Sequence, residues 1–139
     1  AKIIDARRDP MACCFSGYKQ LFAEGQEFSY RLEDLAHYYK EYVSTMAHWD
    51  KVLPGCVCRI YNERLIENPE KEIRRMLDYC GLQFEASCLN FHENKRAVRT
   101  PSSEQVRQPI YRSAMYQWQH YAPWLEPLSR ALSEGDEGN

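Results

Sequence analysis

Two side chains near the start of the sequence have the chemistry of a phosphate-binding pair. Arg8 offers a planar guanidinium that donates two hydrogen bonds to one phosphate, and the hydroxyl of Ser16, eight residues later, adds a third donor. Both residues lie in the string KIIDARRDPMACCFSGY. Structural roles compete with this interpretation, because Arg-Asp-Pro is a common helix start and a serine within a helix often serves only as a small packing residue.

A second concentration of polar chemistry lies between residues 95 and 112. This segment holds five basic residues and one acidic residue, a local charge of +4, although the whole chain of 139 residues has a net charge of −2. A basic segment in a near-neutral protein favours a local anionic ligand over general binding to nucleic acid or membrane. A solvated basic loop is the alternative. The charged residues are Lys95, Arg96, Arg99, Glu104, Arg107 and Arg112.

The residues around Arg8 predict how it is positioned. A short apolar run, Lys2–Ala6, is typical of a β-strand. Asp9 and Pro10 follow as a natural N-cap and first residue of a helix, which we expect to continue to about Ala23. The amides at the start of that helix would then lie beside the carboxyl end of the strand, where open α/β sheets bind phosphorylated ligands.

The rest of the chain predicts a second strand and several more helices. A continuous apolar stripe predicts a helix over residues 32–53, and Cys56–Tyr61 is typical of a strand parallel to the first, because helices connect the two. Further helices are expected at 69–80, 86–92, 113–119 and 123–132, with a turn at 62–64 and a disordered acidic tail at 133–139. The predicted fold class is therefore α/β, mostly helical with about two parallel strands.

The composition excludes several classes of protein. Hydrophobic residues make up 44% of the chain, with ten Tyr, five Phe and three Trp, which is incompatible with disorder. No apolar run approaches the roughly 20 residues of a membrane span. The six cysteines and four histidines have no zinc-ligand spacing, so we expect no metal and reduced, mostly buried thiols. Without a signal peptide at its start, the chain is expected to be cytoplasmic. Its near-neutral charge argues against general binding to nucleic acid or membrane.

Taken together, the motifs resemble the PAPS-dependent sulfotransferases, which transfer a sulfuryl group from 3′-phosphoadenosine 5′-phosphosulfate (PAPS) to a hydroxyl or amine. The string KIIDARRDPMACCFSGY resembles the family's 3′-phosphate-binding segment. Residues 61–70, YNERLIENPE, resemble its Tyr-Glu-Asp-Leu segment and the Asn-Pro-Glu helix start that follows, and residues 102–113 with Trp118 resemble its C-terminal cofactor loop. The similarity covers residues 1–132 and is nearest in character to tyrosylprotein sulfotransferases and to bacterial sulfotransferases fused to tetratricopeptide repeats.

The resemblance implies a role for each matching residue. Arg8 and Ser16 would hold the 3′-phosphate, Arg112 or Arg107 would make a further phosphate contact, and a serine at 102 or 103 would approach the 5′-phosphosulfate. An aromatic wall could include Tyr111 and Trp118, with packing as the alternative for Trp118. The implied co-substrate is PAPS, released as adenosine 3′,5′-bisphosphate, with no metal. The implied binding residues are Arg8, Ser16, Ser102, Ser103, Arg107, Tyr111 and Arg112.

The same resemblance implies a fold and an incomplete site. Residues 1–132 would form the C-terminal half of a P-loop nucleotide-kinase-like sulfotransferase fold. In the family, the phosphosulfate loop and the catalytic base, a His or Glu, precede the strand at which this chain begins. We therefore assign no catalytic residue and expect the isolated chain to be incomplete, with an unidentified acceptor. An exposed sheet edge leaves open association with a second copy or with a missing N-terminal half.

Three positions depart from the family pattern and keep a second hypothesis open. Ala12 stands where the family has an aspartate, and Asn62 and Arg64 replace the tyrosine and aspartate of Tyr-Glu-Asp-Leu. Stacking on adenine would then need Tyr61 in a shifted register. The alternative is a catalytically inactive, degenerate or truncated sulfotransferase-like helical interaction module. A nucleotide kinase would need a Walker loop and an RNA binder a recognised module, and the sequence has neither.

Overall fold

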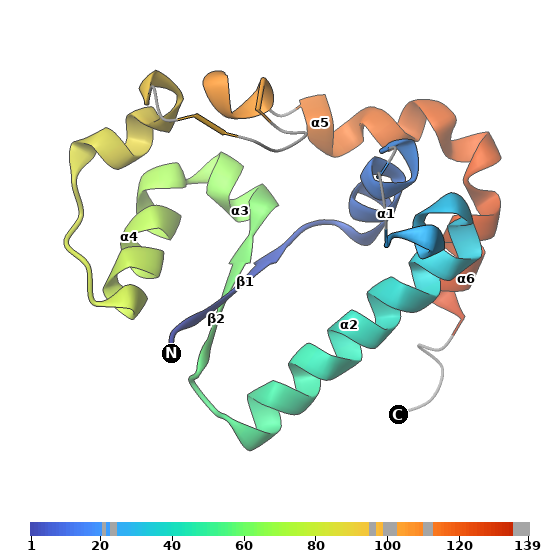
Figure 1. The fold of residues 1–139 in the computed structure, drawn as a ribbon, viewed down its shortest axis with the longest axis horizontal. Coiled ribbons are helices and arrows are strands. Elements are labelled where there is room, and N and C mark those ends of the chain that lie inside the picture. The colour runs from blue at the N-terminus through green and yellow to red at the C-terminus, as the bar shows by residue number, and fades with distance from the viewer. Residues whose placement is uncertain (21, 23–24, 95–96, 99–102, 110–112, 135–139) are drawn as a thin grey trace. The chain divides into compact units, whose positions relative to one another are not determined.

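In a computed structural model, the described residues are 1–20, 22, 25–94, 97–98, 103–109 and 113–134. The chain folds into two compact units (Figure 1). Unit 1 comprises Ala1–Arg7 and Cys58–Arg112, and unit 2 comprises Arg8–Val57 and Ser113–Asn139. None of the described helices combines the length and the apolar character that crossing a membrane requires.

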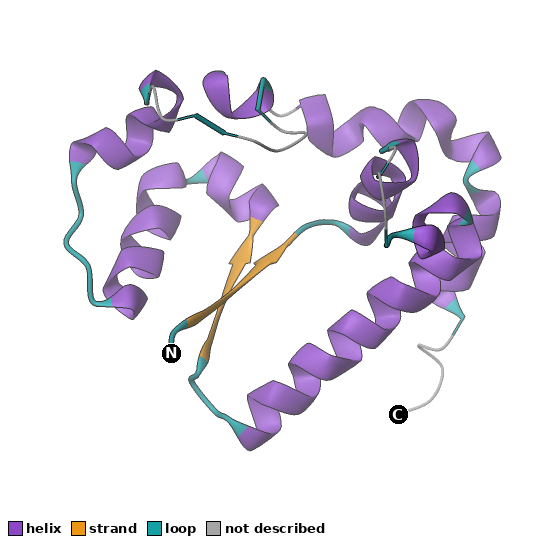
Figure 2. Cartoon of the chain, viewed as in Figure 1, coloured by secondary structure: helices purple, strands orange, loops and turns teal. Residues whose placement is uncertain are grey.

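Unit 1 contains the sheet. Two parallel strands, β1 (Ile3–Arg7) and β2 (Val57–Tyr61), pair with one another, and all their residues except Val57 belong to this unit (Figure 2). The helices of unit 1 are α3 (Asn62–Glu67) and α4 (Pro69–Cys80), followed by the short 3₁₀ helices η2 (Ala86–Glu93) and η3 (Gln105–Arg107). The predicted α/β class and parallel strand pair are confirmed.

Unit 2 is helical and packs around a small core. Its helices are α1 (Pro10–Lys19), η1 (Glu27–Tyr30), α2 (Leu32–Val52), α5 (Ser113–Tyr116), η4 (Gln117–Trp124) and α6 (Glu126–Ser133). The core joins side chains from α1, α2 and the start of α6: Cys14, Phe15, Leu35, Ala36, Leu125 and Leu128. Burial of these apolar side chains supplies the main stabilisation of unit 2.

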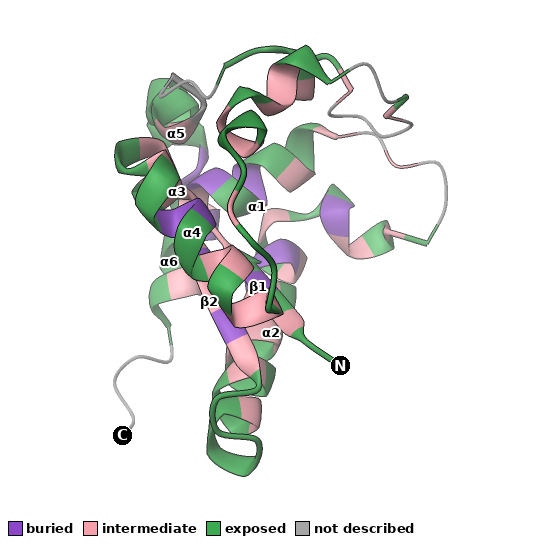
Figure 3. Ribbon diagram, turned by 90° about the vertical axis from the view of Figure 1, so that its left-hand side faces the viewer, coloured by how far each residue is buried: buried purple, intermediate pink, exposed green. Residues whose placement is uncertain are grey.

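The apolar stripe predicted for α2 is fully buried only at Leu35, and Leu53, just after the helix, is 46% exposed. The stripe residues of intermediate burial are Leu32, Tyr39, Tyr42, Met46 and Trp49. Figure 3 shows the C-terminal end of α2 mostly as exposed surface. The regular spacing therefore predicted the helix correctly but overstated how much of its stripe is covered.

Helix α1 begins as predicted and ends earlier than predicted. Asp9 caps its start, because Oδ1 of Asp9 accepts a hydrogen bond of 2.8 Å from the amide of Ala12. The helix ends at Lys19, whereas it was expected to continue to about Ala23. Gln20 leaves the helix with extended backbone, and its N–H donates to the carbonyl of Gly17 at 3.0 Å. A glycine in the last turn lowers the helix propensity at this point.

Two predictions about later elements are wrong. Asn62–Arg64 was expected to be a turn, but it forms the first part of α3, where Glu63 suits the positive end of the helix dipole. The last helix was expected to begin at Pro123, but that residue lies inside η4. Helix α6 begins at Glu126 with Pro127 in its first turn, a position that tolerates a missing N–H.

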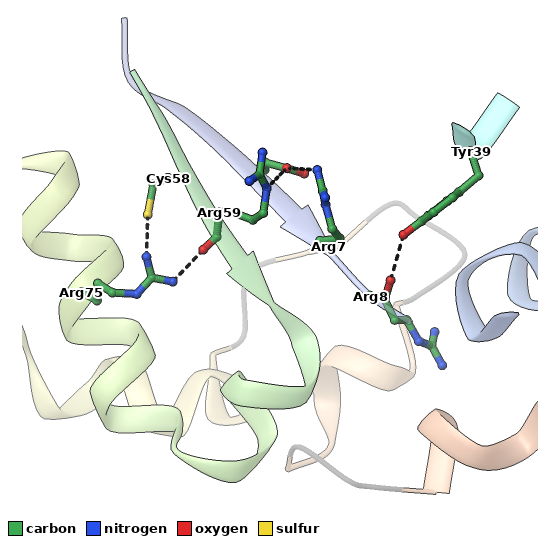
Figure 4. Close-up of polar contacts among 7 residues, drawn as sticks. Arg7, Arg8, Tyr39, Cys58, Arg59 and Arg75 are labelled. Atoms are coloured by element: carbon green, nitrogen blue, oxygen red, sulfur yellow. Dashed lines mark hydrogen bonds and ion pairs between the residues drawn. The ribbon is translucent and has the colours of Figure 1, made fainter. Parts of the chain in front are cut away.

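A buried carboxylate links the two strands of the sheet. Oδ2 of Asp5 on β1 accepts hydrogen bonds from Nη2 of Arg7 at 2.9 Å and from Nε of Arg59 on β2 at 2.8 Å (Figure 4). The Asp5 side chain is only 2% exposed. A charge buried to this extent depends on its partners, because removing them leaves an uncompensated charge in the protein interior.

We predict that replacing Asp5 with alanine lowers the free energy of unfolding by about 3 kcal/mol, because two guanidinium groups lose their buried counter-charge. Urea denaturation followed by circular dichroism measures this change. The control is Glu70→Ala, which removes an exposed ion pair with Arg74 (2.7 Å) and should cost less than about 1 kcal/mol. Equal losses in the two variants would contradict the assignment of Asp5 as the link between the strands.

Candidate functional site

The phosphate-binding pair predicted from sequence lies at the start of α1, within unit 2. Arg8 is half-buried in the connection between β1 and α1, and Ser16 is exposed on the helix. Asp9 and Ser16 lie on one face of α1, because seven residues span about two helical turns. Arg8 and Ser16 are thus at the two ends of one short segment whose geometry α1 fixes.

Ala12, where the family pattern has an acid, lies about one turn before Ser16 on α1. It is 3% exposed, so its methyl group packs in the interior. Its amide is already bound by Asp9 at 2.8 Å. The departure at Ala12 therefore removes a negative charge from α1 without removing the helix cap.

The later predicted residues fall mainly in unit 1. Ser103 is half-buried, and Arg107 is exposed and donates from Nη1 to the backbone carbonyl of Asn94 at 2.6 Å. Ser102, Tyr111 and Arg112 lie outside the described residues. The structure thus brings Arg8 and Ser16 together on one segment and places Ser103 and Arg107 on another, and the binding roles of all seven residues remain predictions.

The aromatic ring considered for adenine stacking already has a neighbour. Tyr61 is the last residue of β2, and the guanidinium carbon of Arg64 lies 4.9 Å from its ring centroid. This cation–π contact occupies one side of the ring. Asn62, which aligns with the family's tyrosine, begins α3 and offers no aromatic surface.

The four histidines lie on helices. His37 and His48 are on α2 and His120 is on η4, all three exposed, while His92 is half-buried on η2. Within the described ranges, no cluster of three or more His, Cys, Asp or Glu side chains could hold a metal ion. No histidine acquires a geometry that identifies it as a catalytic base.

A groove in unit 1 was not anticipated from the sequence. It has a volume of about 950 Å³ and is lined by charged residues of α4, such as Lys71 and Arg74, and by apolar residues such as Leu89 and Phe91 of η2. Arg74 pairs with Glu70, and none of the described residues of the predicted site lines the groove. The lining holds three basic and three acidic side chains, so its charges balance and the α1 segment is the stronger candidate for a phosphate. These side chains are Lys71, Arg74, Arg75, Glu67, Glu70 and Asp78.

Two features together define the class of this protein: a strand that leads into a capped helix, and a guanidinium at that junction followed by a hydroxyl about two turns into the helix. They are typical of the phosphate-binding segments of α/β proteins. Comparison with known families gives the particular assignment. Residues 1–86, which include β1, α1, α2, β2, α3 and α4, match the sulfotransferase family. The chain belongs to the sulfotransferase family.

Two relatives match the chain over different lengths. An uncharacterized protein of Aquifex aeolicus (strain VF5) is 36% identical over 138 residues, which cover 97% of this chain and 18% of that protein. A Caenorhabditis briggsae protein, provisionally named a protein-tyrosine sulfotransferase, is 34% identical over 70 residues, covering 47% of this chain and 25% of that protein. The matched region thus spans a quarter or less of the length of either relative.

Two adjacent cysteines on α1 have opposite surroundings. Cys13 is exposed, whereas Cys14 is 3% exposed in the core of unit 2, and burial raises the pKa of Cys14 to about 12, with smaller contributions from Cys13 and Asp9. The expectation of mostly buried thiols is wrong, because only Cys14 and Cys58 are buried. The other four point to exposed or partly exposed faces of their elements: Cys13, Cys56, Cys80 and Cys88.

We predict that iodoacetamide at pH 8 alkylates Cys13 and leaves Cys14 unmodified, because only the thiolate reacts and Cys14 stays protonated. Fragment-ion mass spectrometry distinguishes the two neighbours. An unfolded thiol ionises near 9.0, so the stability linked to the Cys14 proton is constant below pH 9 and is lost as pH rises towards 12. In urea both thiols should react, and equal alkylation of the native chain would contradict the prediction.

Proposed function

We propose that this chain supplies the 3′-phosphate-binding part of a PAPS-dependent sulfotransferase. One observation carries the proposal: Arg8 at the end of β1 and Ser16 on α1 fall within the region that matches the sulfotransferase family. A guanidinium and a hydroxyl are suitable donors for a phosphate dianion, because charge-assisted hydrogen bonds are about twice as strong as neutral ones. In this proposal both side chains contact the 3′-phosphate of the nucleotide.

The basic segment would supply the second group of contacts. Arg107 is exposed and Ser103 half-buried in unit 1, and the net charge of +4 between residues 95 and 112 favours a polyanionic ligand. Ser102, Tyr111 and Arg112 belong to the same proposed group through the resemblance of residues 102–113 to the family's cofactor loop. Phosphate contacts of this kind would be sensitive to salt, since they are largely electrostatic.

The proposed reaction is an in-line transfer of a sulfuryl group. A bond forms between sulfur and the acceptor oxygen or nitrogen while the bond from sulfur to the phosphate oxygen breaks, and adenosine 3′,5′-bisphosphate leaves. The acceptor's proton passes to a base that we assign to no residue of this chain. Arg8 and Ser16 would act at a distance from the reacting atoms by fixing the nucleotide in position.

The class of acceptor is also part of the proposal. The name of the Caenorhabditis briggsae relative makes a peptide tyrosine the first acceptor to test. Sugar hydroxyls and small alcohols or amines are the other acceptor classes to include in the assay.

A helical interaction module without catalytic activity is the second candidate. The contact between Tyr61 and Arg64 favours it, because the tyrosine nearest to the family's adenine-binding position already has a guanidinium on its ring. A lost base–aromatic stack would weaken nucleotide binding by roughly 1–3 kcal/mol. A folded chain that binds no adenosine 3′,5′-bisphosphate at millimolar concentration would favour this second candidate.

We predict that Arg8→Ala weakens binding of adenosine 3′,5′-bisphosphate by about a hundredfold or more, because a bidentate charged contact is lost. Ser16→Ala should weaken binding by about tenfold, since it removes a single donor to a charged group. Isothermal titration calorimetry measures both affinities.

The matched control for this experiment is Arg31→Ala. Arg31 is also a unit 2 arginine that precedes a helix, and its side chain is 69% exposed. Its replacement should change the affinity by less than about twofold, because exposed charges are largely screened. A nucleotide affinity that is insensitive to Arg8→Ala would overturn the proposed function.

A further inference from the structure

A tyrosine outside the sequence motifs contacts the backbone of Arg8. The hydroxyl of Tyr39 on α2 donates a hydrogen bond of 3.3 Å to the carbonyl oxygen of Arg8, although the two residues are 31 positions apart (Figure 4). Both residues belong to unit 2. This contact brings the middle of a long helix to the short connection that holds the proposed phosphate-binding arginine.

The ring of Tyr39 is held in place by packing. It is partly buried against the core cluster of unit 2, and its centroid lies 5.8 Å from that of Tyr42 in an edge-on arrangement. A tyrosine with an apolar body in the core and a hydrogen-bonded hydroxyl is a rigid anchor, because its side chain has few rotatable bonds. The position of the hydroxyl therefore follows from the packing of α2.

Hydrogen bonds hold the backbone on both sides of the peptide bond between Arg8 and Asp9. On the helix side, Asp9 accepts hydrogen bonds of 2.8 Å from the amides of Ala12 and Cys13, through its side chain and its backbone carbonyl. On the other side, Tyr39 holds the carbonyl of Arg8. Holding this carbonyl restricts the ψ rotation of Arg8, and ψ is one of the two soft backbone torsions that decide in which direction its side chain leaves the backbone.

Tyr39 and the Arg8 guanidinium lie on different sides of the Arg8 backbone (Figure 4). In Figure 4 the carbonyl of Arg8 faces the Tyr39 hydroxyl, and the guanidinium extends to the opposite side. The hydroxyl of Tyr39 therefore contacts the backbone of Arg8 and leaves the guanidinium accessible to a phosphate. Holding a side chain near its binding orientation raises affinity, because less conformational freedom is lost when the ligand binds.

We infer that Tyr39 is a positioning residue for the 3′-phosphate site: its hydroxyl orients Arg8 through the backbone and does not touch the nucleotide. This inference rests on the proposed function and adds a residue that the motif does not include. Loss of the Tyr39 hydroxyl should therefore lower the affinity only for nucleotides that carry a 3′-phosphate. A misplaced Arg8 weakens the 3′-phosphate contact and leaves contacts to the adenosine and the 5′-phosphate unchanged.

The test compares Tyr39→Phe with the unaltered chain by calorimetry, using adenosine 3′,5′-bisphosphate and adenosine 5′-monophosphate. We expect the affinity for the bisphosphate to fall by about threefold to tenfold and that for the monophosphate to stay the same, so that their ratio falls. The matched control is Tyr38→Phe, because Tyr38 is the adjacent α2 tyrosine and is 57% exposed. It should leave the ratio unchanged.

A second measurement does not depend on nucleotide binding. Relaxation of the Arg8 Nε–Hε group by nuclear magnetic resonance should show larger fast motions in Tyr39→Phe than in Tyr38→Phe, because only the former loses the hydrogen bond to the Arg8 carbonyl. Unchanged motion of this group would overturn the inference, even where the variant is less stable.

The outcomes separate the two proposals. Equal losses of affinity for both nucleotides, or an unchanged ratio in Tyr39→Phe, would overturn the role of Tyr39 and leave the proposed function in place. An unaltered chain that binds no bisphosphate would overturn the proposed function and this inference with it.

Discussion

The hydrogen bond from the Ala12 amide to the Asp9 carboxylate is the contact on which the candidate site most depends. It caps α1 at its first turn and so fixes where the helix begins, at Pro10. Ser16 takes its position from the helix that this contact begins, and Arg8 precedes the cap directly. With the cap in place, the guanidinium and the hydroxyl occupy fixed positions along one segment. Without it, the first turn of α1 would lose about 0.5–2 kcal/mol of stability, and the backbone next to Arg8 would be held less firmly.

A long-range contact completes this local arrangement. Asp9 and α1 are adjacent in sequence to Arg8, but Tyr39 reaches it from α2, which packs against α1 through Phe15 and Leu35 in the core of unit 2. Apolar packing in the core thereby positions the Tyr39 hydroxyl, which makes a directional hydrogen bond to Arg8. Under the proposed function, substitutions in the core of unit 2 would therefore change phosphate binding without contacting the nucleotide.

Sequence patterns predicted those parts of the fold that local interactions decide. The Asp9–Pro10 start of α1 was predictable because both signals act within one turn, and so was the end of α4, where Gly81 adopts a positive φ of 74°. The helical character of Asn62–Arg64 was missed, because polar residues after a strand resemble a turn until the helix that follows is known. The exposed end of α2 was missed for a different reason: periodicity reports a stripe but not what covers it.

The residues of the candidate site also fall into two groups, those that the sequence could predict and one that it could not. Arg8 and Ser16 could be predicted because their spacing along one segment is visible in the sequence, whereas Tyr39 could not, because only tertiary packing brings it to Arg8. The sulfotransferase family match over residues 1–86 includes all three residues.

The most direct test of this account is a crystal structure of the chain with adenosine 3′,5′-bisphosphate. The account predicts 3′-phosphate oxygens about 3 Å from both the Arg8 guanidinium and the Ser16 hydroxyl. A nucleotide bound in the groove beside α4, or with its 3′-phosphate away from Arg8, would contradict it.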